Sequence, residues 1–456
     1  MKRESFKSRL GFLLVSAGCA IGIGNVWRFP YVAGQNGGGI FVLFYLIFLI
    51  AMGLPVLTME FAVGRASRKS AVLGYKALEK EGSKWHIHGW IAMFGCYMLM
   101  MYYTTVSGWM VSYFFKFLKG EFQTGMTADD TAAVFSNLLA DPGQMAFWMI
   151  ITVILGFFVC SRGLQNGLEK ISKIMMSALL ILIVVLAVHS ITLQGAAEGV
   201  KFYLVPNLDT VAETGLKNVI TEAMNQAFFT LSVGMGGMAI FGSYVGKDRS
   251  LMGESIHIII LDTLVAVIAG IIIFPACFTY DVEVTAGPSL LFDTMATVFN
   301  NMAGGRWWGT LFFLFMVFAA MSTVLGVCEN ILAMVRELTG WSRPAGCVAC
   351  GAGCFLLALT TALGFSVFHF QPFAAGTTWL DFWDFLVSNN IMPIGSILLA
   401  VFCCYKVGWG WDKFLEEANA GKGLKVQPWM KPVFKYFVPA AVLFIYVYGM
   451  VNFAWK

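Results

Sequence analysis

The first apolar segment of the chain, which begins at Leu10, contains glycines where a membrane-spanning helix would need to be continuous. Gly18, Gly22 and Gly24 lie close together and are followed by Asn25. Each glycine costs a helix ~1 kcal/mol relative to alanine, and a broken helix in hydrocarbon leaves backbone groups that must face protein, water, an ion or a ligand. We therefore predict a broken helix here. Its free carbonyls suit a small hard cation, and the free amides of its second half suit a carboxylate.

Two other interpretations of this segment exist. The Gly18-x-x-x-Gly22 pair has the small-residue spacing that packs membrane helices against each other, and for that pair alone packing is the stronger interpretation. The basic residues before the apolar run also resemble those of a cleaved signal peptide. The signal-peptide interpretation fails because further apolar segments follow, rather than a soluble domain.

Composition defines the broad class. Of the 456 residues, 58% are hydrophobic and 12% are charged, whereas soluble chains carry about 25% charged residues. The chain is therefore expected to be an all-α polytopic membrane protein. Runs long enough to cross about 30 Å of hydrocarbon predict eleven spans, at 10–33, 39–63, 89–118, 145–161, 167–193, 218–245, 255–280, 306–335, 345–369, 377–405 and 433–455. The stretch 288–303 is expected to be a re-entrant or surface helix.

The distribution of positive charge predicts the orientation. If the N-terminus is cytoplasmic, most of the 30 lysines and arginines fall in cytoplasmic segments, as the positive-inside rule requires. With eleven spans, the C-terminus then lies outside. We expect a multi-pass protein of the cell's inner (plasma) membrane.

The sixth predicted span is interrupted like the first one. Thr230 and Ser232 come just before Gly234, Gly236 and Gly237. Two interrupted spans, first and sixth, predict two five-helix repeats around a site at mid-membrane, and two unrelated packing kinks are the alternative. The predicted division is a first repeat at 10–193, a second repeat at 218–405, a cytoplasmic connector at 406–432 and an eleventh helix at 433–455.

Two later spans carry polar residues. Asp262 lies among apolar residues of the seventh span, where a lone carboxylate is costly and therefore functional by default; a bound cation would satisfy it. In the eighth span Ala319, Ser322, Thr323 and Gly326 share one helix face. Close packing would explain the small residues. The hydroxyls could instead bind a sodium ion, in addition to the cation expected near Asp262. The sequence leaves both interpretations open.

Enzyme motifs are missing. The chain has no Gly-x-x-x-x-Gly-Lys-Ser/Thr phosphate loop, its histidines are scattered without ligand spacing, and no soluble domain is long enough for an active site. Cys347, Cys350 and Cys354 begin an apolar segment and have no acidic or histidine partner nearby, so zinc is a weak interpretation. We predict that the protein is not an enzyme.

A set of motifs carries a family resemblance. They are Gly22-Ile23-Gly24-Asn25-Val26-Trp27-Arg28-Phe29-Pro30-Tyr31, Asn36-Gly37-Gly38-Gly39, Gly53-Leu54-Pro55 with Glu60, Phe228-Phe229-Thr230-Leu231-Ser232 and Ser243-Tyr244-Val245. From about residue 3 to 405 the chain resembles the neurotransmitter:sodium symporter family, and in particular bacterial eleven-helix transporters of multiple hydrophobic amino acids and of tyrosine. The resemblance implies the LeuT fold, a 5+5 inverted repeat with unwound helices 1 and 6, and sodium-coupled alternating access.

The resemblance also implies site residues. A first sodium ion would bind the Ala20 carbonyl, Asn25, Thr230 and Asp262. A second would bind the carbonyls of Gly18, Ile21 and Ala319 and the hydroxyls of Ser322 and Thr323. The substrate would contact Ala20, Gly22, Ile23, Gly24, Leu99, Tyr103, Phe229, Thr230, Ser232, Met235, Thr323 and Val327. Arg28 and Asp384 resemble the outer gate, under a Phe229 lid, and Arg3, Ser243 or Tyr244, and Glu337 resemble the inner one.

The substrate class follows from Gly22, because monoamine-transporting members of the family carry an aspartate at that position. Glycine there implies an amino acid that brings its own carboxylate. The apolar walls would leave a charged side chain without a partner, and Met235 is pliable, so aliphatic and aromatic amino acids are expected. The alternatives are a sodium- or proton-coupled carrier of another zwitterion such as taurine or betaine, or a non-transporting sensor or channel.

At two positions the residue differs from the one that some members of this family carry. Ala266 stands where chloride-dependent relatives use serine, and the fixed carboxylate of Asp262 can balance sodium charge, so chloride independence is expected. Ser177 stands where some relatives have a proline that lets the fifth helix unwind. The expected partners are an amino acid, sodium ions and the lipid bilayer, with no nucleic acid; the oligomeric state is left open.

Overall fold

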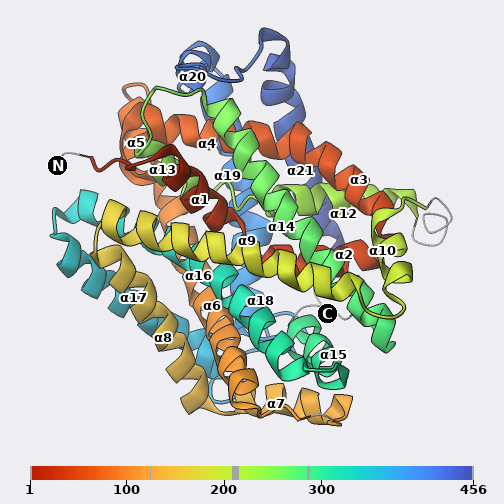
Figure 1. Ribbon diagram of the computed structural model, residues 1–456. Helices are drawn as coiled ribbons and strands as arrows, with labels where there is room; N and C mark the ends of the chain where they lie inside the picture. The colour runs from red at the N-terminus through yellow and green to blue at the C-terminus, as the bar shows by residue number, and fades with distance from the viewer. Residues whose placement is uncertain (1–2, 124, 208–214, 285–287, 454–456) are drawn as a thin grey trace.

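The computed structural model describes residues 3–123, 125–207, 215–284 and 288–453. Apart from one isolated bridge between Arg249 and Lys422, the regular structure of these residues is helical (Figure 1). Eight helices in this described part are long and apolar enough to cross a membrane: Gly39–Ser67, Pro142–Ser161, Leu164–Ile191, Leu251–Tyr280, Gly305–Thr339, Arg343–Gly364, Trp379–Cys404 and Pro428–Asn452. A bent pair, Arg9–Ala20 with Gly24–Gln35, makes a ninth if it counts as one span.

Helices also occupy the two other predicted spans, although neither meets the same criterion of length and hydropathy. One is α6 (His86–Lys119), which is long but carries many buried hydroxyl and glycine residues inside the molecule. The other is divided into α12 (Leu216–Phe229) and α13 (Gly237–Ser243), each too short to span alone. In the described residues the criterion of length and hydropathy thus selects up to nine of the eleven predicted spans. Helices occupy the other two, which escape the criterion because a helix enclosed by protein does not need an apolar surface.

The predicted break in the first span is present. Helix α1 (Arg9–Ala20) is capped at its start by Ser8, whose hydroxyl accepts from the Gly11 amide. It ends where Ile21 adopts an extended conformation, and helix resumes in η1 (Gly24–Arg28) and α2 (Phe29–Gln35) after a bend of 59°. The prediction of a broken first helix is confirmed.

The sixth span breaks between Phe229 and Gly237. Within the break Ser232, Gly234 and Gly236 all have positive φ angles. At Gly234 only glycine fits, because φ is +95° and an added Cβ would lie 2.4 Å from the carbonyl oxygen of Met392. Gly236 is the N-cap residue of α13, so the glycines lie before the start of the second half-helix, whereas α12 already ends at Phe229.

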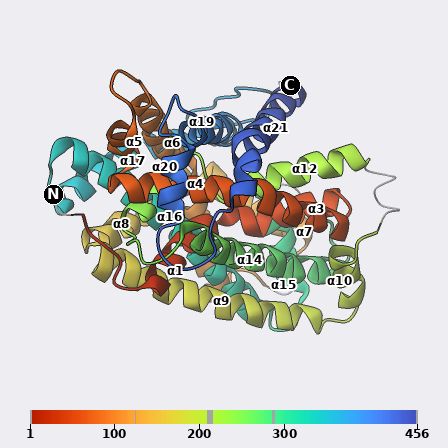
Figure 2. The same ribbon diagram turned by 90° about the horizontal axis from the view of Figure 1, so that it is seen from above.

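The broken helices lie at the centre of the bundle. Helix α1 packs against α16 (Gly305–Thr339), α14 (Leu251–Tyr280) and α9 (Lys170–Ile191), while α12 packs along α3 (Gly39–Phe48), as Figure 2 shows from above. Enclosure by neighbouring helices allows non-helical backbone at membrane depth.

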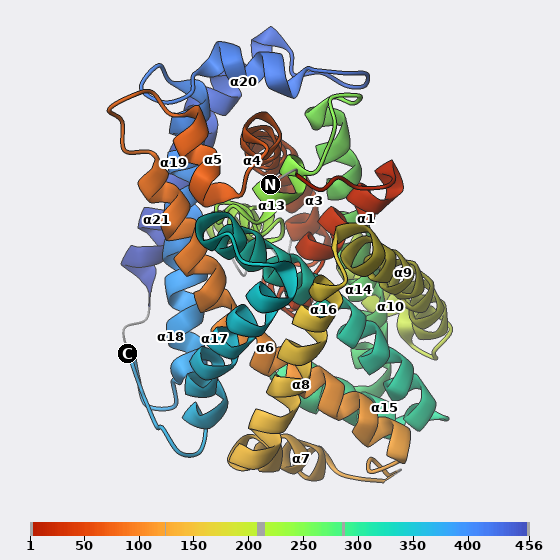
Figure 3. The same cartoon turned by 90° about the vertical axis from the view of Figure 1, so that its left-hand side faces the viewer.

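The remaining elements close the ends of the bundle. Figures 1 and 3 show α20 (Trp411–Ala418) and α7 (Ala128–Ala140) at opposite ends. The predicted re-entrant or surface stretch 288–303 is helical but buried, in η4 (Leu290–Thr294) and α15 (Met295–Asn301). Nearly all of these residues pack against the rest of the bundle.

Candidate functional site

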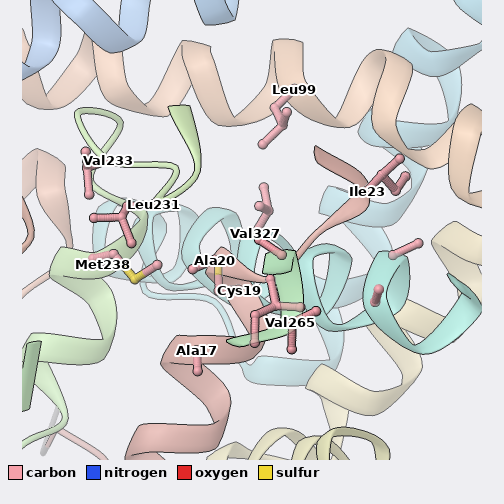
Figure 4. Close-up of a cluster of buried hydrophobic side chains, with 14 of the residues drawn as sticks. Ala17, Cys19, Ala20, Ile23, Leu99, Leu231, Val233, Met238, Val265 and Val327 are labelled. Carbon is pink, nitrogen blue, oxygen red and sulfur yellow. The ribbon is translucent and has the colours of Figure 1, made fainter. Parts of the chain in front are cut away.

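A cavity of about 130 Å³ lies between the two broken helices. Eleven of the twelve predicted substrate-contact residues line it, namely Ala20, Gly22, Ile23, Gly24, Leu99, Tyr103, Phe229, Thr230, Ser232, Met235 and Thr323. The exception is Val327, which is buried but is not part of the lining. Figure 4 shows Leu99 of α6 and Val327 of α16 pointing toward one another above Ala20 and Cys19.

The sequence interpretation missed several lining residues: Trp27, Tyr102, Val106, Leu380, Ser388 and Met392. A signal for two of them was present. Leu99, Tyr102, Tyr103 and Val106 follow the i, i+3, i+4, i+7 spacing that places side chains on one helix face. Leu380, Ser388 and Met392 come from the tenth predicted span, and nothing in their sequence context indicates that they reach the cavity.

Gly22 and Ile23 of the first break line the cavity, and their backbone amides donate to side chains. The Ile23 amide donates to the Tyr103 hydroxyl at 3.1 Å, and the Gly22 amide donates to Asn25 Oδ1 at 3.1 Å. The space at Gly22 is tight, since an added Cβ would lie 2.6 Å from Tyr103 Oη and 3.0 Å from Thr323 Oγ1. Amide and hydroxyl donors at one point form an arrangement that suits a carboxylate.

The three side chains predicted for the first sodium site come together. The carboxylate of Asp262, which is 0% exposed, accepts from Asn25 Nδ2 at 2.9 Å and from Thr230 Oγ1 at 2.9 Å. No lysine or arginine among the described residues forms an ion pair with Asp262. A buried carboxylate with a hydroxyl oxygen beside it is the ligand type that hard cations prefer. Asn25 presents its amide nitrogen to this carboxylate, while its oxygen accepts from the Gly22 amide.

The residues predicted for the second sodium site also meet. Ser322 Oγ donates to the carbonyls of Ala319 at 2.9 Å and of Ile21 at 3.4 Å. Thr323 Oγ1 lies 3.4 Å from the Ile21 carbonyl and 3.3 Å from that of Cys19, which the sequence interpretation did not include. Gly18 lies alongside, because a Cβ added to it would be 3.1 Å from the Cβ of Ser322.

The predicted outer gate pair is not formed in this structure. Arg28 and Asp384 both line the cavity, but no ion pair joins them among the described residues. The Arg28 guanidinium instead lies 4.3 Å from the centre of the Phe229 ring. Asp384 accepts from Tyr102 Oη at 3.0 Å and from Ser388 Oγ at 2.7 Å. These competing partners hold the two charges apart.

The predicted inner gate residues are in contact. Arg3 forms an ion pair with Glu337, donates to Ser243 Oγ at 2.6 and 3.0 Å, and lies 4.6 Å over the Tyr244 ring. Tyr244 in turn donates to Glu329 at 2.7 Å. The sequence interpretation missed Glu329, because no sequence motif indicates which residue this buried carboxylate contacts.

Glu60 was noted only as part of a motif, and the structure gives it a physical role. Its carboxylate accepts from the amides of Gly234 at 2.8 Å and Met238 at 3.0 Å, on either side of the start of α13. These amides are freed by the break in the sixth span. Glu60 therefore satisfies donors that would otherwise be unpaired at membrane depth.

The fold and the site together define a class: a helical membrane transporter with a small central cavity between two broken helices. The chain belongs to the sodium:neurotransmitter symporter family, whose family model matches residues 3–131 and 129–456. The protein is accordingly a sodium-dependent, multi-pass membrane transporter and not an enzyme, as the sequence predicted.

Relatives span the whole chain. The uncharacterized sodium-dependent transporter YhdH of Bacillus subtilis is 33% identical over 454 residues, which cover 98% of this chain and 97% of that one. A sodium-dependent transporter of Methanocaldococcus jannaschii is 30% identical, covering 94% and 87%. The crystal structure of MhsT in complex with L-phenylalanine matches with a TM-score of 0.85 and 33% identity over 98% of this chain and 99% of that one. The predicted LeuT fold is confirmed.

Proposed function

We propose that this protein imports hydrophobic amino acids, both aliphatic and aromatic, together with sodium by alternating access. The observation that carries the proposal is the position of the cavity. Residues of the first break and the hydroxyl residues Tyr103 and Thr323 line one part of the cavity, and apolar side chains line the other part. The cavity also lies beside the buried Asp262 cluster. A zwitterion with an apolar side chain matches both parts.

The polar end of the cavity favours a zwitterionic substrate. The Ile23 and Gly24 amides with Tyr103 would hold the carboxylate, and the carbonyls around Ala20 and Phe229 would hold the ammonium group. Position 22 is a glycine, so no acidic side chain stands there to pair with an amine that lacks a carboxylate.

The other end of the cavity favours an apolar side chain. Leu99, Val106, Phe229, Met235 and Met392 supply its walls. A charged substrate side chain among them would be buried without a partner. MhsT, which is 33% identical and was solved with L-phenylalanine, supports this substrate class.

Two sodium ions are part of the proposal. The first would use Ala20, Asn25, Thr230 and Asp262, and the second Gly18, Ile21, Ala319, Ser322 and Thr323. In the first set the oxygens of Thr230 and Asp262 lie within hydrogen-bond distance of one another. In the second set the hydroxyls of Ser322 and Thr323 lie as close to the carbonyls of Ala319 and Ile21. Such groups of oxygens support hard-cation sites. Asp262 would supply fixed negative charge, so we propose that transport does not require chloride.

The proposal includes the direction of transport and the gates. The N-terminus would be cytoplasmic and the C-terminus outside, with repeats at 10–193 and 218–405, a connector at 406–432 and an eleventh helix at 433–455, whose last two residues lie outside the described ones. Arg3, Tyr244 and Glu337 would close the cytoplasmic side. Arg28 and Asp384 would approach each other over the substrate to close the outer side.

Uptake into proteoliposomes tests the function. An inward sodium gradient should drive accumulation of labelled phenylalanine and leucine, and a choline gradient should not. Asp262→Ala and the isosteric Asp262→Asn should reduce sodium-driven uptake, whereas Asp412→Asn, which removes an exposed carboxylate of α20, should not. Preferential accumulation of taurine or betaine would favour the alternative zwitterion carrier, and equilibration without accumulation would favour a channel or sensor.

A further inference from the structure

An apolar groove runs along the outside of the bundle between α8 (Pro142–Ser161) and α17 (Arg343–Gly364), which lie side by side in Figures 1 and 3. Its volume is about 450 Å³. Ile154, Phe158 and Val348 line it and remain 58%, 54% and 74% exposed. Both helices are long and apolar enough to span the membrane, so this groove opens toward lipid.

One end of the groove carries the positive charge of Arg162. Arg162 follows the last residue of α8, is exposed, and places its guanidinium 4.8 Å from the centre of the Phe158 ring. Among the described residues it forms no ion pair. Arg343 is the first residue of α17. It differs from Arg162 because it pairs with Glu329 at 2.8 Å and with Glu4 at 3.3 Å.

A polar hollow of about 490 Å³ lies near this end, since Arg162 in its wall directly follows Ser161 of the groove lining. The other charged groups in its wall already have partners. Arg3 pairs with Glu337, and Glu4 pairs with Arg343 and accepts from the Leu164 amide at 2.8 Å. Arg162 is therefore the cation in this hollow that is free to bind an anion.

We propose that the groove and Arg162 form a binding site for an anionic phospholipid, with an acyl chain in the groove and the headgroup phosphate on the guanidinium. A planar guanidinium binds phosphate oxygens through paired hydrogen bonds. Basic pockets between membrane helices on the cytoplasmic side are known lipid headgroup sites. The end of α8 belongs to a segment that the charge distribution places in the cytoplasm, so the headgroup lies in the inner leaflet.

The charge contribution is tested by native mass spectrometry of the full-length protein titrated with phosphatidylglycerol and with phosphatidylcholine of identical acyl chains. The wild type should bind phosphatidylglycerol more tightly. Arg162→Gln should reduce this preference by about fivefold, since one basic side chain near a membrane surface contributes ~1 kcal/mol. Arg249→Gln removes the same charge from another exposed site and should leave the preference unchanged; an equal loss in both variants would overturn the proposal.

The groove itself is tested by filling it. Ala352 lines the groove and is exposed, and Ala349 is exposed on the same helix outside the groove lining. Ala352→Phe should weaken both lipids and Ala349→Phe neither. Binding of glycerol 3-phosphate as tightly as of the whole lipid would overturn the proposal in favour of a soluble-phosphate site. A changed fraction of dimer with unchanged lipid binding would also overturn it, because the groove would then contact a second copy of the chain.

Discussion

Adding one methyl group at Gly22 tests the packing of the cavity most directly. In Gly22→Ala the new Cβ would lie 2.6 Å from Tyr103 Oη and 3.0 Å from Thr323 Oγ1. The backbone at this position has an ordinary negative φ, so alanine meets no conformational penalty there. The effect must therefore come from the contact with the Tyr103 hydroxyl.

The size of the effect follows from the hydrogen bond that this hydroxyl makes. To reach an ordinary contact distance Tyr103 Oη must retreat by several tenths of an ångström, and it would lose the 3.1 Å bond from the Ile23 amide. The Tyr103 hydroxyl is also proposed to donate to the substrate carboxylate, and the loss of a hydrogen bond to a charged group costs about 1.5–3 kcal/mol. Substrate affinity should therefore fall about 10- to 150-fold.

The assay is sodium-dependent binding of labelled L-phenylalanine to purified protein, with two glycine controls. A Cβ at Gly24 meets Phe229 Cε1 at 3.1 Å, a ring edge that can move aside, so Gly24→Ala should weaken binding by less than Gly22→Ala. A Cβ at Gly353 meets nothing within 4 Å, so Gly353→Ala should bind like the wild type. If Gly22→Ala binds as tightly as the wild type, the packing argument is wrong; thermal unfolding of each variant separates lost binding from lost folding.

Three further outcomes are expected. Glu417→Gln should lower the free energy of unfolding by about 3–5 kcal/mol, because the fully buried guanidinium of Arg65 loses the negative charge that lies 2.6 Å away. Lys247→Gln, which removes a 66% exposed cation from the same carboxylate, should change it by less than about 1 kcal/mol. Similar unfolding midpoints for the two variants would contradict this prediction. Sodium-driven uptake should persist when gluconate replaces chloride, and its collapse would refute the role given to Asp262. Val327→Ala should lower stability by about 1 kcal/mol without changing substrate preference, whereas Leu99→Ala should alter preference; competition assays against several amino acids would detect the opposite pattern.

Much of the site was predictable because it depends on local exceptions to the rules of membrane helices. Glycines in an apolar run, as at Gly22 and Gly234, indicate a break wherever they occur. A carboxylate such as Asp262 in a span demands a partner in any fold. These signals need no knowledge of neighbouring helices.

Other features could not be predicted because the residues involved look ordinary in the sequence. Val327 lies one helical turn after Thr323 on the same helix face, and only the packing of α16 decides that Thr323 reaches the cavity and Val327 does not. Length and hydropathy likewise describe α6 poorly, since a helix enclosed by protein need not present an apolar face to lipid.

The sequence by itself determined that this chain is a helical membrane protein with two broken spans, because hydrophobicity and helix breaking are properties of short segments. The tertiary structure alone decided which partners the charges find. Arg28 lies over Phe229 while Asp384 accepts from Tyr102, and Arg65 is buried against Glu417 of the distant connector. Such pairings depend on distances between segments hundreds of residues apart, and these distances are fixed only when the helices pack.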